Sequence, residues 1–296
     1  MKILNFGSLN IDHVYEVPYF PHPGETLSSI KYNSYPGGKG LNQSVAIAKA
    51  GSYVYHAGKI GENSEILIQA LQESGVDTTL LDHTGRVTGH AIIQVDHSGD
   101  NCIILHGGSN KEITQDYINQ VFSLLEEDDI LVLQNEINDL QIIVDKAIEK
   151  KLRIALNPSP MDARLRKLNL SGITWLILNE IEGAELSGSK DPNEITTILL
   201  ERYPQLKIVL TLGEKGSIYQ EKELRYEQPI FPVSVKDTTA AGDTFTGYFI
   251  SMVSSGFEVS EALKIASKAA SLAVSREGAS SSIPTKDEVL TALYNG

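Results

Sequence analysis

Cysteine is nearly absent from this chain of 296 residues, in which Cys102 is the only one. One thiol cannot form an internal disulfide framework or a CxxC redox pair, and it excludes any zinc site that needs two cysteines. We therefore expect a fold held together by an apolar core, with Cys102 as a small buried apolar side chain.

Long apolar runs and an excess of positive charge are missing as well. No apolar run reaches 18 residues, so we expect no membrane span, and the apolar start of the chain is too short for a signal peptide. The 25 basic residues are outnumbered by 38 acidic ones, and the net charge of −13 repels nucleic-acid backbones and anionic lipid. These absences predict a soluble, cytoplasmic protein without nucleic-acid or membrane partners. They do not exclude a small anion held in a local electropositive pocket.

The chain does contain a regular alternation of short apolar runs with amphipathic helical segments. The runs are rich in Ile, Leu and Val and end at Gly, Asn, Asp or Pro, as expected for strands buried on both faces. They occupy residues 2–9, 53–57, 130–134, 153–156, 175–178 and 207–212. Strands that alternate with helices predict βαβ units and an α/β fold with a doubly wound, mostly parallel sheet. Because the chain shows no linker and no repeat, we expect a single domain over residues 1–296.

Two segments, residues 13–35 and 87–105, break this alternation because they carry no helical period and contain turn residues. Strands without crossover helices do not join a parallel sheet easily. We therefore expect these insertions to form a small antiparallel β lid. The alternative is a pair of hairpins that only decorate the surface. The lid is favoured because both segments flank the motifs described next.

The strongest motif is KDTTAAGDTFTG at residues 236–247, which follows a candidate strand at residues 231–235 and opens a helix. The small residues Ala240, Ala241 and Gly242 let a ligand approach the backbone closely. The first N–H groups of a helix are unpaired and lie at the positive end of its dipole. The loop is therefore a candidate anion hole for a phosphate or a developing negative charge. Asp243, just inside the helix, is either a helix cap or a general base.

Two further polar segments lie near the N-terminus. In GSLNID (residues 7–12), Asn10 and Asp12 point the same way at the carboxyl end of a predicted strand, where open α/β sheets bind ligands. Their side chains suit a polyol, although a simple turn uses the same residue types. The glycine-rich segment PGGKGLNQ (residues 36–43) leads into a helix but matches neither GxGxxG nor the P-loop pattern.

GSLNID, GGKGLNQ and DTTAAGDTFTG stand in the order and spacing of a known family. The chain resembles the ribokinase branch of the PfkB carbohydrate-kinase family over nearly its whole length. NEIE at residues 179–182 is similar to the family's NxxE motif, and TLGEKG at residues 211–216 is similar to its nucleotide-site turn. The resemblance implies an ATP-dependent sugar kinase with ribose as the first candidate substrate, Mg²⁺ as the metal cofactor and K⁺ as a monovalent activator.

The resemblance also implies a role for each matching residue. Asp243 would be the base that takes the proton from a sugar hydroxyl, and the backbone of Ala240, Ala241 and Gly242 would be the anion hole. The sugar contacts would come from Asn10, Asp12, Gly38, Lys39, Asn42 and Glu136. The ATP site would be lined by Asn179, Thr211, Gly213 and Gly216, with Asn179 and Glu182 organising Mg²⁺. A K⁺ site would be formed by Asp237, Thr239, Ala273, Gly278 and Ser282.

Several alternatives stay open at this point. Thr246 stands where ribose kinases of the family commonly carry Asn, so a fructokinase, a 2-keto-3-deoxygluconate kinase or a nucleoside kinase is the alternative within the family. A non-catalytic sugar-binding protein is the remote alternative, because a fold alone does not fix function. We also expect a homodimer through the lid, from the family and from one uncovered apolar face of the lid strands. That face would carry Ile92, Val95, Ile103 and Leu105.

Overall fold

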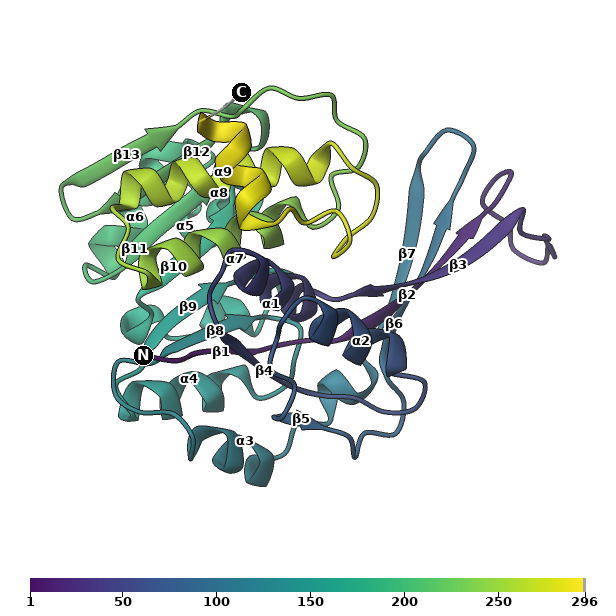
Figure 1. Cartoon of the computed structure of the whole chain (residues 1–296), viewed down its shortest axis with the longest axis horizontal. Helices are drawn as coiled ribbons and strands as arrows, with labels where there is room; N and C mark the ends of the chain where they lie inside the picture. Colours follow the sequence, from purple (N-terminus) through teal and green to yellow (C-terminus); the bar gives the residue numbers. More distant parts are fainter. Residues whose placement is uncertain (295–296) are drawn as a thin grey trace.

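The computed structural model describes residues 1–294 and shows a large twisted sheet with helices on both faces and a smaller sheet that projects from one end (Figure 1). In these residues the large sheet has the strand order β13-β12-β11-β10-β9-β8-β1-β4-β5. The strands are β1 Ile3–Phe6, β4 Val54–Lys59, β5 Leu81–Asp82, β8 Ile130–Gln134, β9 Arg153–Asn157, β10 Trp175–Asn179, β11 Lys207–Thr211, β12 Ser217–Glu221 and β13 Leu224–Gln228. Neighbouring strands from β11 to β5 run parallel, and β12 and β13 are antiparallel. The predicted doubly wound, mostly parallel sheet is confirmed.

The helices form two layers, and each layer buries one side of the strands. One layer contains α1 Lys39–Lys49, α2 Glu65–Glu73, α7 Ala241–Ser254, α8 Val259–Val274 and α9 Lys286–Tyr294. The other contains α3 Gln115–Phe122, α4 Leu140–Glu149, α5 Glu180–Ser187 and α6 Pro192–Arg202. In β10, Trp175 and Ile177 belong to the first core, whereas Leu176 and Leu178 belong to the second. The strands are apolar on both faces because both faces are covered.

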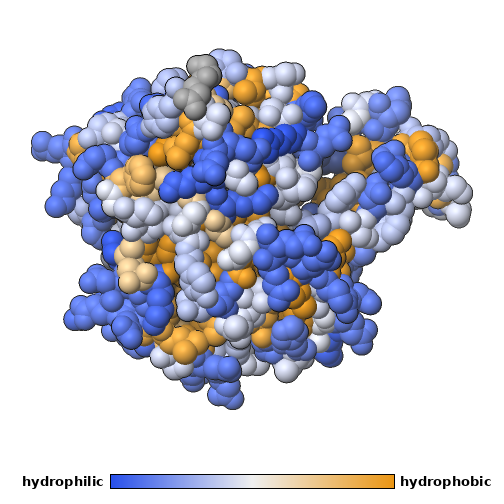
Figure 2. Space-filling view, in the orientation of Figure 1, coloured by the Kyte–Doolittle hydropathy of each residue, from blue (hydrophilic) through white to orange (hydrophobic). Residues whose placement is uncertain are grey.

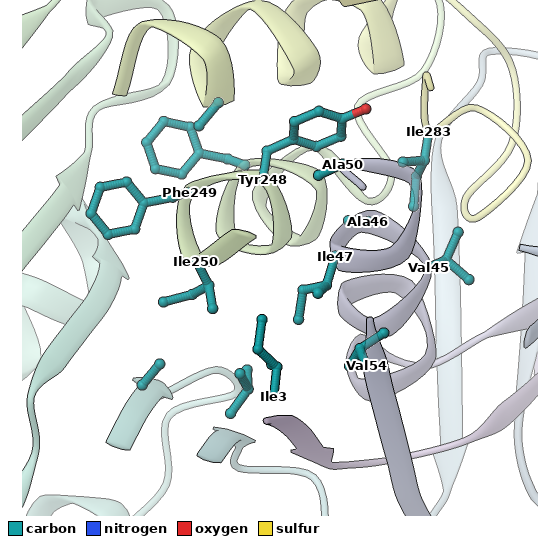
Figure 3. Packing of buried hydrophobic residues seen from close by; sticks show 14 of the residues in the cluster. Ile3, Val45, Ala46, Ile47, Ala50, Val54, Tyr248, Phe249, Ile250 and Ile283 are labelled. Atoms are coloured by element: carbon teal, nitrogen blue, oxygen red, sulfur yellow. The ribbon is translucent and has the colours of Figure 1, made fainter. Parts of the chain in front are cut away.

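Helices α1 and α7 approach each other closely beside β1. Ala46 and Ile47 of α1 and Ile250 of α7 lie above Ile3 of β1 (Figure 3). A Cβ atom on Gly247 would lie 2.4 Å from the Cβ atom of Ala46. Glycine at this position therefore allows the backbones of α1 and α7 to approach each other closely.

The smaller sheet is the predicted lid. Its strands are β2 Asn10–Glu16, β3 Lys31–Gly37, β6 Gly89–Val95 and β7 Asn101–His106, in the order β3-β2-β6-β7. The hairpins β2–β3 and β6–β7 are antiparallel, and their inner strands β2 and β6 pair in parallel. Figure 2 shows this sheet as an arm beside the main body, with hydrophobic side chains on its exposed surface. Because β2 follows β1 after three residues, the lid grows directly from the carboxyl edge of the large sheet.

Three local predictions were wrong. Residues 231–235 form no strand, because Pro232 lacks the N–H that a ladder needs and the β12–β13 hairpin occupies that edge of the sheet. Cys102 is exposed, because β7 is the outer strand of the lid and is solvated on both faces. The strand register places Ile92 opposite Ile104, on the other face of the lid from Ile103 and Leu105, because successive side chains of a strand alternate.

None of the helices in residues 1–294 combines the length and the apolarity needed to cross a membrane. The single domain over residues 1–296, of which the last two lie outside the described residues, stays a prediction.

Candidate active site

A cavity of about 240 Å³ lies where the parallel strands end and helix α7 begins. Eight of the predicted site residues line it. They are Lys39, Asn179, Glu182, Thr211, Ala240, Ala241, Gly242 and Asp243. Segments from four parts of the sequence therefore meet around one space. Thr246, which the sequence analysis linked to substrate choice, also lines this cavity, as do Asn157, Ser159 and Thr238, to which it assigned no role.

The start of α7 presents open backbone N–H groups. Ala240 is in the left-handed conformation with φ of 59°, and the first helical hydrogen bond runs from the Thr244 N–H to the Ala240 carbonyl at 2.8 Å. The N–H groups of Gly242 and Asp243 precede that bond and are outside the helical ladder. A Cβ atom on Gly242 would meet nothing within 4 Å. The loop is therefore open to a ligand, as expected of an anion hole.

Asp243 is buried at 7% exposure and is held by two consecutive residues of α1. The Asn42 Nδ2 donates to Oδ2 of Asp243 at 3.1 Å, and the Gln43 Nε2 donates to Oδ1 at 2.9 Å. The charge of Asp243 raises the pKa of Lys39 against the effect of burial, and Glu136 adds to the rise. The carboxylate thus lies beside a cation and within a fixed pair of N–H donors, as a positioned base requires.

Glu136 connects the first strand with the glycine-rich loop. One carboxylate oxygen accepts hydrogen bonds from the Ser8 hydroxyl and, at 3.1 Å, from the Lys39 backbone N–H. Burial and, to a smaller extent, the nearby charge of Glu136 together raise the pKa of Asp12 to about 7. Asp12 and Glu136 are therefore close enough to act on one ligand, and a polyol could neutralise their mutual repulsion by donating hydroxyl hydrogen bonds to both.

Asn10 and Asn42 complete the predicted sugar residues. Asn10 is buried, and its Oδ1 accepts a hydrogen bond from the Asn110 Nδ2 at 2.8 Å. The Asn110 side chain also bonds the N–H and the carbonyl of Leu9, and so clamps the start of β2. The Oδ1 of Asn42 is buried and accepts no hydrogen bond from the described residues. It is therefore an available acceptor for a hydroxyl group.

Asn179 and Glu182 hold each other at the start of α5 in a capping box. The Glu182 N–H donates to the Asn179 Oδ1 at 2.9 Å, and the Asn179 N–H donates to the Glu182 Oε2 at 3.0 Å. Glu182 nevertheless lines the cavity. Residues 1–294 contain no group of three or more His, Cys, Asp or Glu arranged to hold a metal. A single carboxylate fits Mg²⁺ that keeps its waters and binds nucleotide phosphates, as Mg²⁺ usually does.

The predicted nucleotide turn follows β11. Thr211 lines the cavity, whereas Gly213 and Gly216 do not. Both glycines have positive φ, of 54° and 97°, and a Cβ atom on Gly216 would lie 2.1 Å from the Gln228 carbonyl oxygen. In this structure the two glycines shape the turn that carries Thr211.

The residues predicted for K⁺ lie on two segments that meet beside the anion hole. The carboxylate of Asp237 accepts hydrogen bonds from the N–H groups of Thr239 at 2.8 Å and Gly278 at 3.0 Å. Burial acts to raise the pKa of Asp237, but these hydrogen bonds outweigh it and lower the pKa. Ala273 and Ser282 lie on the same C-terminal segment as Gly278, without a direct hydrogen bond to Asp237 among the described contacts. Asp237 would supply one carboxylate to the proposed site, and each of its two oxygens accepts a hydrogen bond from a backbone N–H group.

The sequence analysis quoted Gln43 but gave it no role, and it missed Asn110 and Gln134. All three are buried polar residues that contact predicted site residues or their neighbours. A polar residue on the apolar face of a helix or strand is the signal that would have pointed to Gln43 and Gln134. Asn110 lies in the short 3₁₀ helix Gly108–Lys111 after β7, which is too short for a periodicity that would separate buried from exposed residues.

The sequence of this chain matches the model of the pfkB family of carbohydrate kinases over residues 1–286. The chain belongs to this family. As a pfkB family kinase, it is a phosphotransferase that acts on an alcohol group of a carbohydrate. The predicted resemblance and fold are both confirmed.

Individual pfkB family members agree with this assignment over nearly their whole length. Ribokinase from Haemophilus influenzae is 34% identical over 296 residues, which cover 97% of this chain and 96% of the relative. Ribokinase from Bacillus subtilis is 32% identical, and the match covers 97% of this chain and 98% of the relative. The crystal structure of ribokinase from Thermotoga maritima superimposes with a TM-score of 0.89 at 34% identity and covers 99% of both chains. Arabidopsis thaliana ribokinase complexed with ribose and ATP has a TM-score of 0.88 at 30% identity and covers 99% of this chain and 98% of that one.

Proposed function

We propose that this kinase is an ATP-dependent ribokinase, which converts D-ribose and ATP to D-ribose 5-phosphate and ADP. The observation that carries the proposal is the buried Asp243 carboxylate, held by two N–H donors directly behind the open N-terminus of α7. The relatives that are named ribokinases support ribose as the substrate.

The reaction needs a base and a place for negative charge. Asp243 accepts the proton of the sugar 5-hydroxyl while that oxygen attacks the γ-phosphorus of ATP, and the bond from the γ-phosphorus to the β-phosphate oxygen breaks to release ADP. The backbone N–H groups from Ala240 to Gly242 and the ammonium of Lys39 stabilise the charge on the transferring phosphoryl group. Catalysis of this kind consists mostly of positioning and electrostatic stabilisation.

The sugar is placed by residues on both sheets. Asn10 and Asp12 of β2, Asn42 of α1 and Glu136 after β8 offer acceptors and donors to its hydroxyls, with Gly38 and Lys39 as the loop beneath it. Asn179, Thr211, Gly213 and Gly216 are the proposed ATP residues. Glu182 would hold Mg²⁺, which would supply positive charge to neutralise the nucleotide phosphates. Asp237, Thr239, Ala273, Gly278 and Ser282 would hold K⁺ beside the anion hole.

The lid provides the surface for the proposed homodimer. Ile103 and Leu105 of β7 are 55% and 52% exposed and share one face of the lid with Val95 and Asp12. A two-faced exposed apolar strand is unusual in a monomer. A second copy of the chain would cover this face. The cytoplasmic location stays a prediction.

A different pfkB substrate is the second candidate. Thr246 lines the cavity and is buried at 1% exposure, in the place where ribose kinases commonly carry Asn. A relative from Salmonella typhi that is 29% identical is a deoxyribokinase. A non-catalytic sugar-binding protein is disfavoured, because the chain keeps both the buried carboxylate and the open helix start.

The experiment that tests the proposal is ADP release by the purified protein with Mg-ATP and D-ribose. It is run with K⁺ and then with Na⁺ as the sole monovalent cation, and against 2-deoxyribose, fructose, 2-keto-3-deoxygluconate and nucleosides. We expect turnover with ribose that depends on K⁺. Turnover with a different acceptor but not with ribose would change the proposed substrate and keep the kinase assignment. Ribose binding in calorimetry without turnover on any acceptor would contradict the proposed reaction.

A further inference from the structure

Below the cavity, a series of buried amides links Asp243 to strands β1 and β8. The Gln43 Nε2 donates to the Asp243 Oδ1, and the Gln43 Oε1 accepts from the Gln134 Nε2 at 2.7 Å. The Gln134 Nε2 also donates to the Asn5 Oδ1 at 2.9 Å. Gln43, Gln134 and Asn5 are each 0% exposed. Buried amides are costly unless they are hydrogen-bonded, so their presence at this place calls for a physical reason.

Each amide in the series can point in only one direction. Asn5 donates its Nδ2 to a backbone carbonyl of α1 at 2.7 Å and to the Ser44 Oγ at 2.9 Å, which turns its Oδ1 towards Gln134. Gln134 must therefore present its NH₂ group at the junction. Gln43 must then accept with its Oε1, which leaves its own NH₂ for Asp243. Asn5 of β1 and Gln134 of β8 thus determine the orientation of the Gln43 amide.

The far end of the series is neutral. The Nδ1 of His56 lies 2.7 Å from the Ser44 Oγ, which already accepts from Asn5 and so donates its proton to the histidine. Burial lowers the pKa of His56 to about 3, against a smaller opposite effect of the Gly7 backbone. Because His56 is uncharged and the amides do not titrate, the series orients Asp243 and does not carry protons to it.

The series is not an efficient way to stabilise a core. The Gln134 Oε1 is buried and has no hydrogen-bond partner in residues 1–294, and it occupies the space that a Cβ atom on Gly7 would need. Buried polar groups that keep an unpaired acceptor are generally less stabilising than apolar side chains of the same shape. Holding one carboxylate in one orientation is a function that apolar side chains could not perform.

We propose that Gln43 is a positioning residue for Asp243 and that Gln134 acts on catalysis only through Gln43. Asn42 holds one carboxylate oxygen and Gln43 the other, so the plane of the carboxylate is fixed relative to α1, which also carries Lys39. This inference rests on the proposed function, in which Asp243 is the base. Both glutamines are completely buried, so neither is expected to contact the sugar or the nucleotide.

The test compares Gln43→Met, Gln134→Met and the double variant with Gln141→Met, the same change at an exposed glutamine of α4. The measurements are kcat, KM for ribose, ribose binding by calorimetry and urea unfolding. Because a small misplacement of a reacting group is costly, we expect Gln43→Met to lower kcat at least about tenfold. We expect it to change KM for ribose by less than about threefold, because it loses no substrate contact. Gln141→Met is expected to match the unchanged protein.

The double variant decides between positioning and a purely structural role. If Gln134 acts through Gln43, Gln134→Met lowers kcat in the natural background and lowers it no further in the Gln43→Met background. Independent effects on kcat that multiply, or a folded Gln43→Met with unchanged kcat, would overturn the inference. If Gln43→Met does not fold, unchanged kcat in folded Gln134→Met overturns it equally. Asp243→Asn separates the two proposals: an active Asp243→Asn defeats the proposed function, whereas an inactive Asp243→Asn beside an active Gln43→Met defeats only this inference.

Discussion

Gln43 and Asp243 are 200 residues apart in the sequence, and their side chains are joined by a hydrogen bond of 2.9 Å. Gln43 belongs to the helix that begins at the glycine-rich loop, and Asp243 belongs to the helix that begins at the anion hole. The contact therefore fixes the proposed base relative to the loop on which the sugar would lie. Reactions that depend on positioning are sensitive to such contacts.

Asp243→Asn is expected to remove the base and keep the shape of the site. Because general-base catalysis contributes typically 10²–10⁴-fold, kcat should fall at least about a hundredfold. Ribose binding by calorimetry should survive, because the amide is nearly isosteric with the carboxylate. Turnover close to that of the unchanged protein would show that another group takes the proton.

Asp12 should make ribose use depend on pH. Burial first, and the charge of Glu136 second, raise its pKa to about 7. Sugar hydroxyls donate hydrogen bonds to the carboxylate form, so kcat/KM for ribose should rise as the pH increases from 6 to 8. Asp12→Asn should lack this rise. The KM for ATP serves as the internal control, because the nucleotide side of the cavity is lined by residues other than Asp12.

The same carboxyl should affect stability in the opposite direction. Its folded pKa lies above its ordinary value of 3.8, so between about pH 4 and pH 7 the folded protein binds more protons than the unfolded chain. The contribution of Asp12 to the free energy of unfolding therefore falls as the pH rises through this range. Urea unfolding of Asp12→Asn at pH 5 and pH 8 should show a smaller loss with pH than the natural protein. If both proteins lose the same free energy of unfolding between pH 5 and pH 8, Asp12 is not the group with the raised pKa.

Two glycines of the catalytic helix should respond differently to the same substitution. Gly247→Ala places a Cβ atom 2.4 Å from Ala46 and 2.9 Å from the Gln43 carbonyl oxygen, so it should cost about 1–3 kcal/mol through overpacking. Gly242→Ala meets nothing within 4 Å and should leave the free energy of unfolding nearly unchanged. It should instead lower kcat, because its methyl group narrows the approach to the anion hole. Urea unfolding and ADP release on both variants check this contrast.

Leu105→Lys should separate the proposed homodimer. Leu105 is 52% exposed on β7, so the substitution should leave the isolated fold intact while placing a charge in the interface. Mass measured by light scattering should fall from that of a dimer to that of a monomer at micromolar concentration. Leu124→Lys, at a leucine that is 47% exposed after α3, is the matched control and should leave the mass unchanged. A natural protein that is already monomeric would contradict the proposal.

Local patterns in the sequence predicted the parts of the fold that local forces determine. Runs such as residues 130–134 and 207–212 are mostly apolar, and they form strands covered on both faces. The strand expected at residues 231–235 failed because Pro232 cannot donate to a ladder, which the apolar pattern alone does not reveal. Cys102 was expected inside because thiols usually are, but the lid has no core of its own in this chain.

The candidate site shows the same division between local and distant information. The motif around Asp243 could be recognised because its small residues and its acid are consecutive in the chain. The amide series could not, because Asn5, Gln43 and Gln134 lie on three elements and nothing in the sequence shows that their side chains meet. Only the pairing of β1 with β8 and the packing of α1 over them bring these residues together.

Asp12 lies on the lid strand β2, whereas Asp243 lies on helix α7, which covers one face of the large sheet. An acceptor that hydrogen-bonds to both residues connects the lid with the main body. Part of its binding free energy therefore stabilises the arrangement in which both residues reach it. A single water molecule at Asp243 does not also hydrogen-bond to Asp12. A site that needs both contacts therefore favours a sugar over water, the most abundant competing nucleophile, because water leaves one of the two contacts unmade.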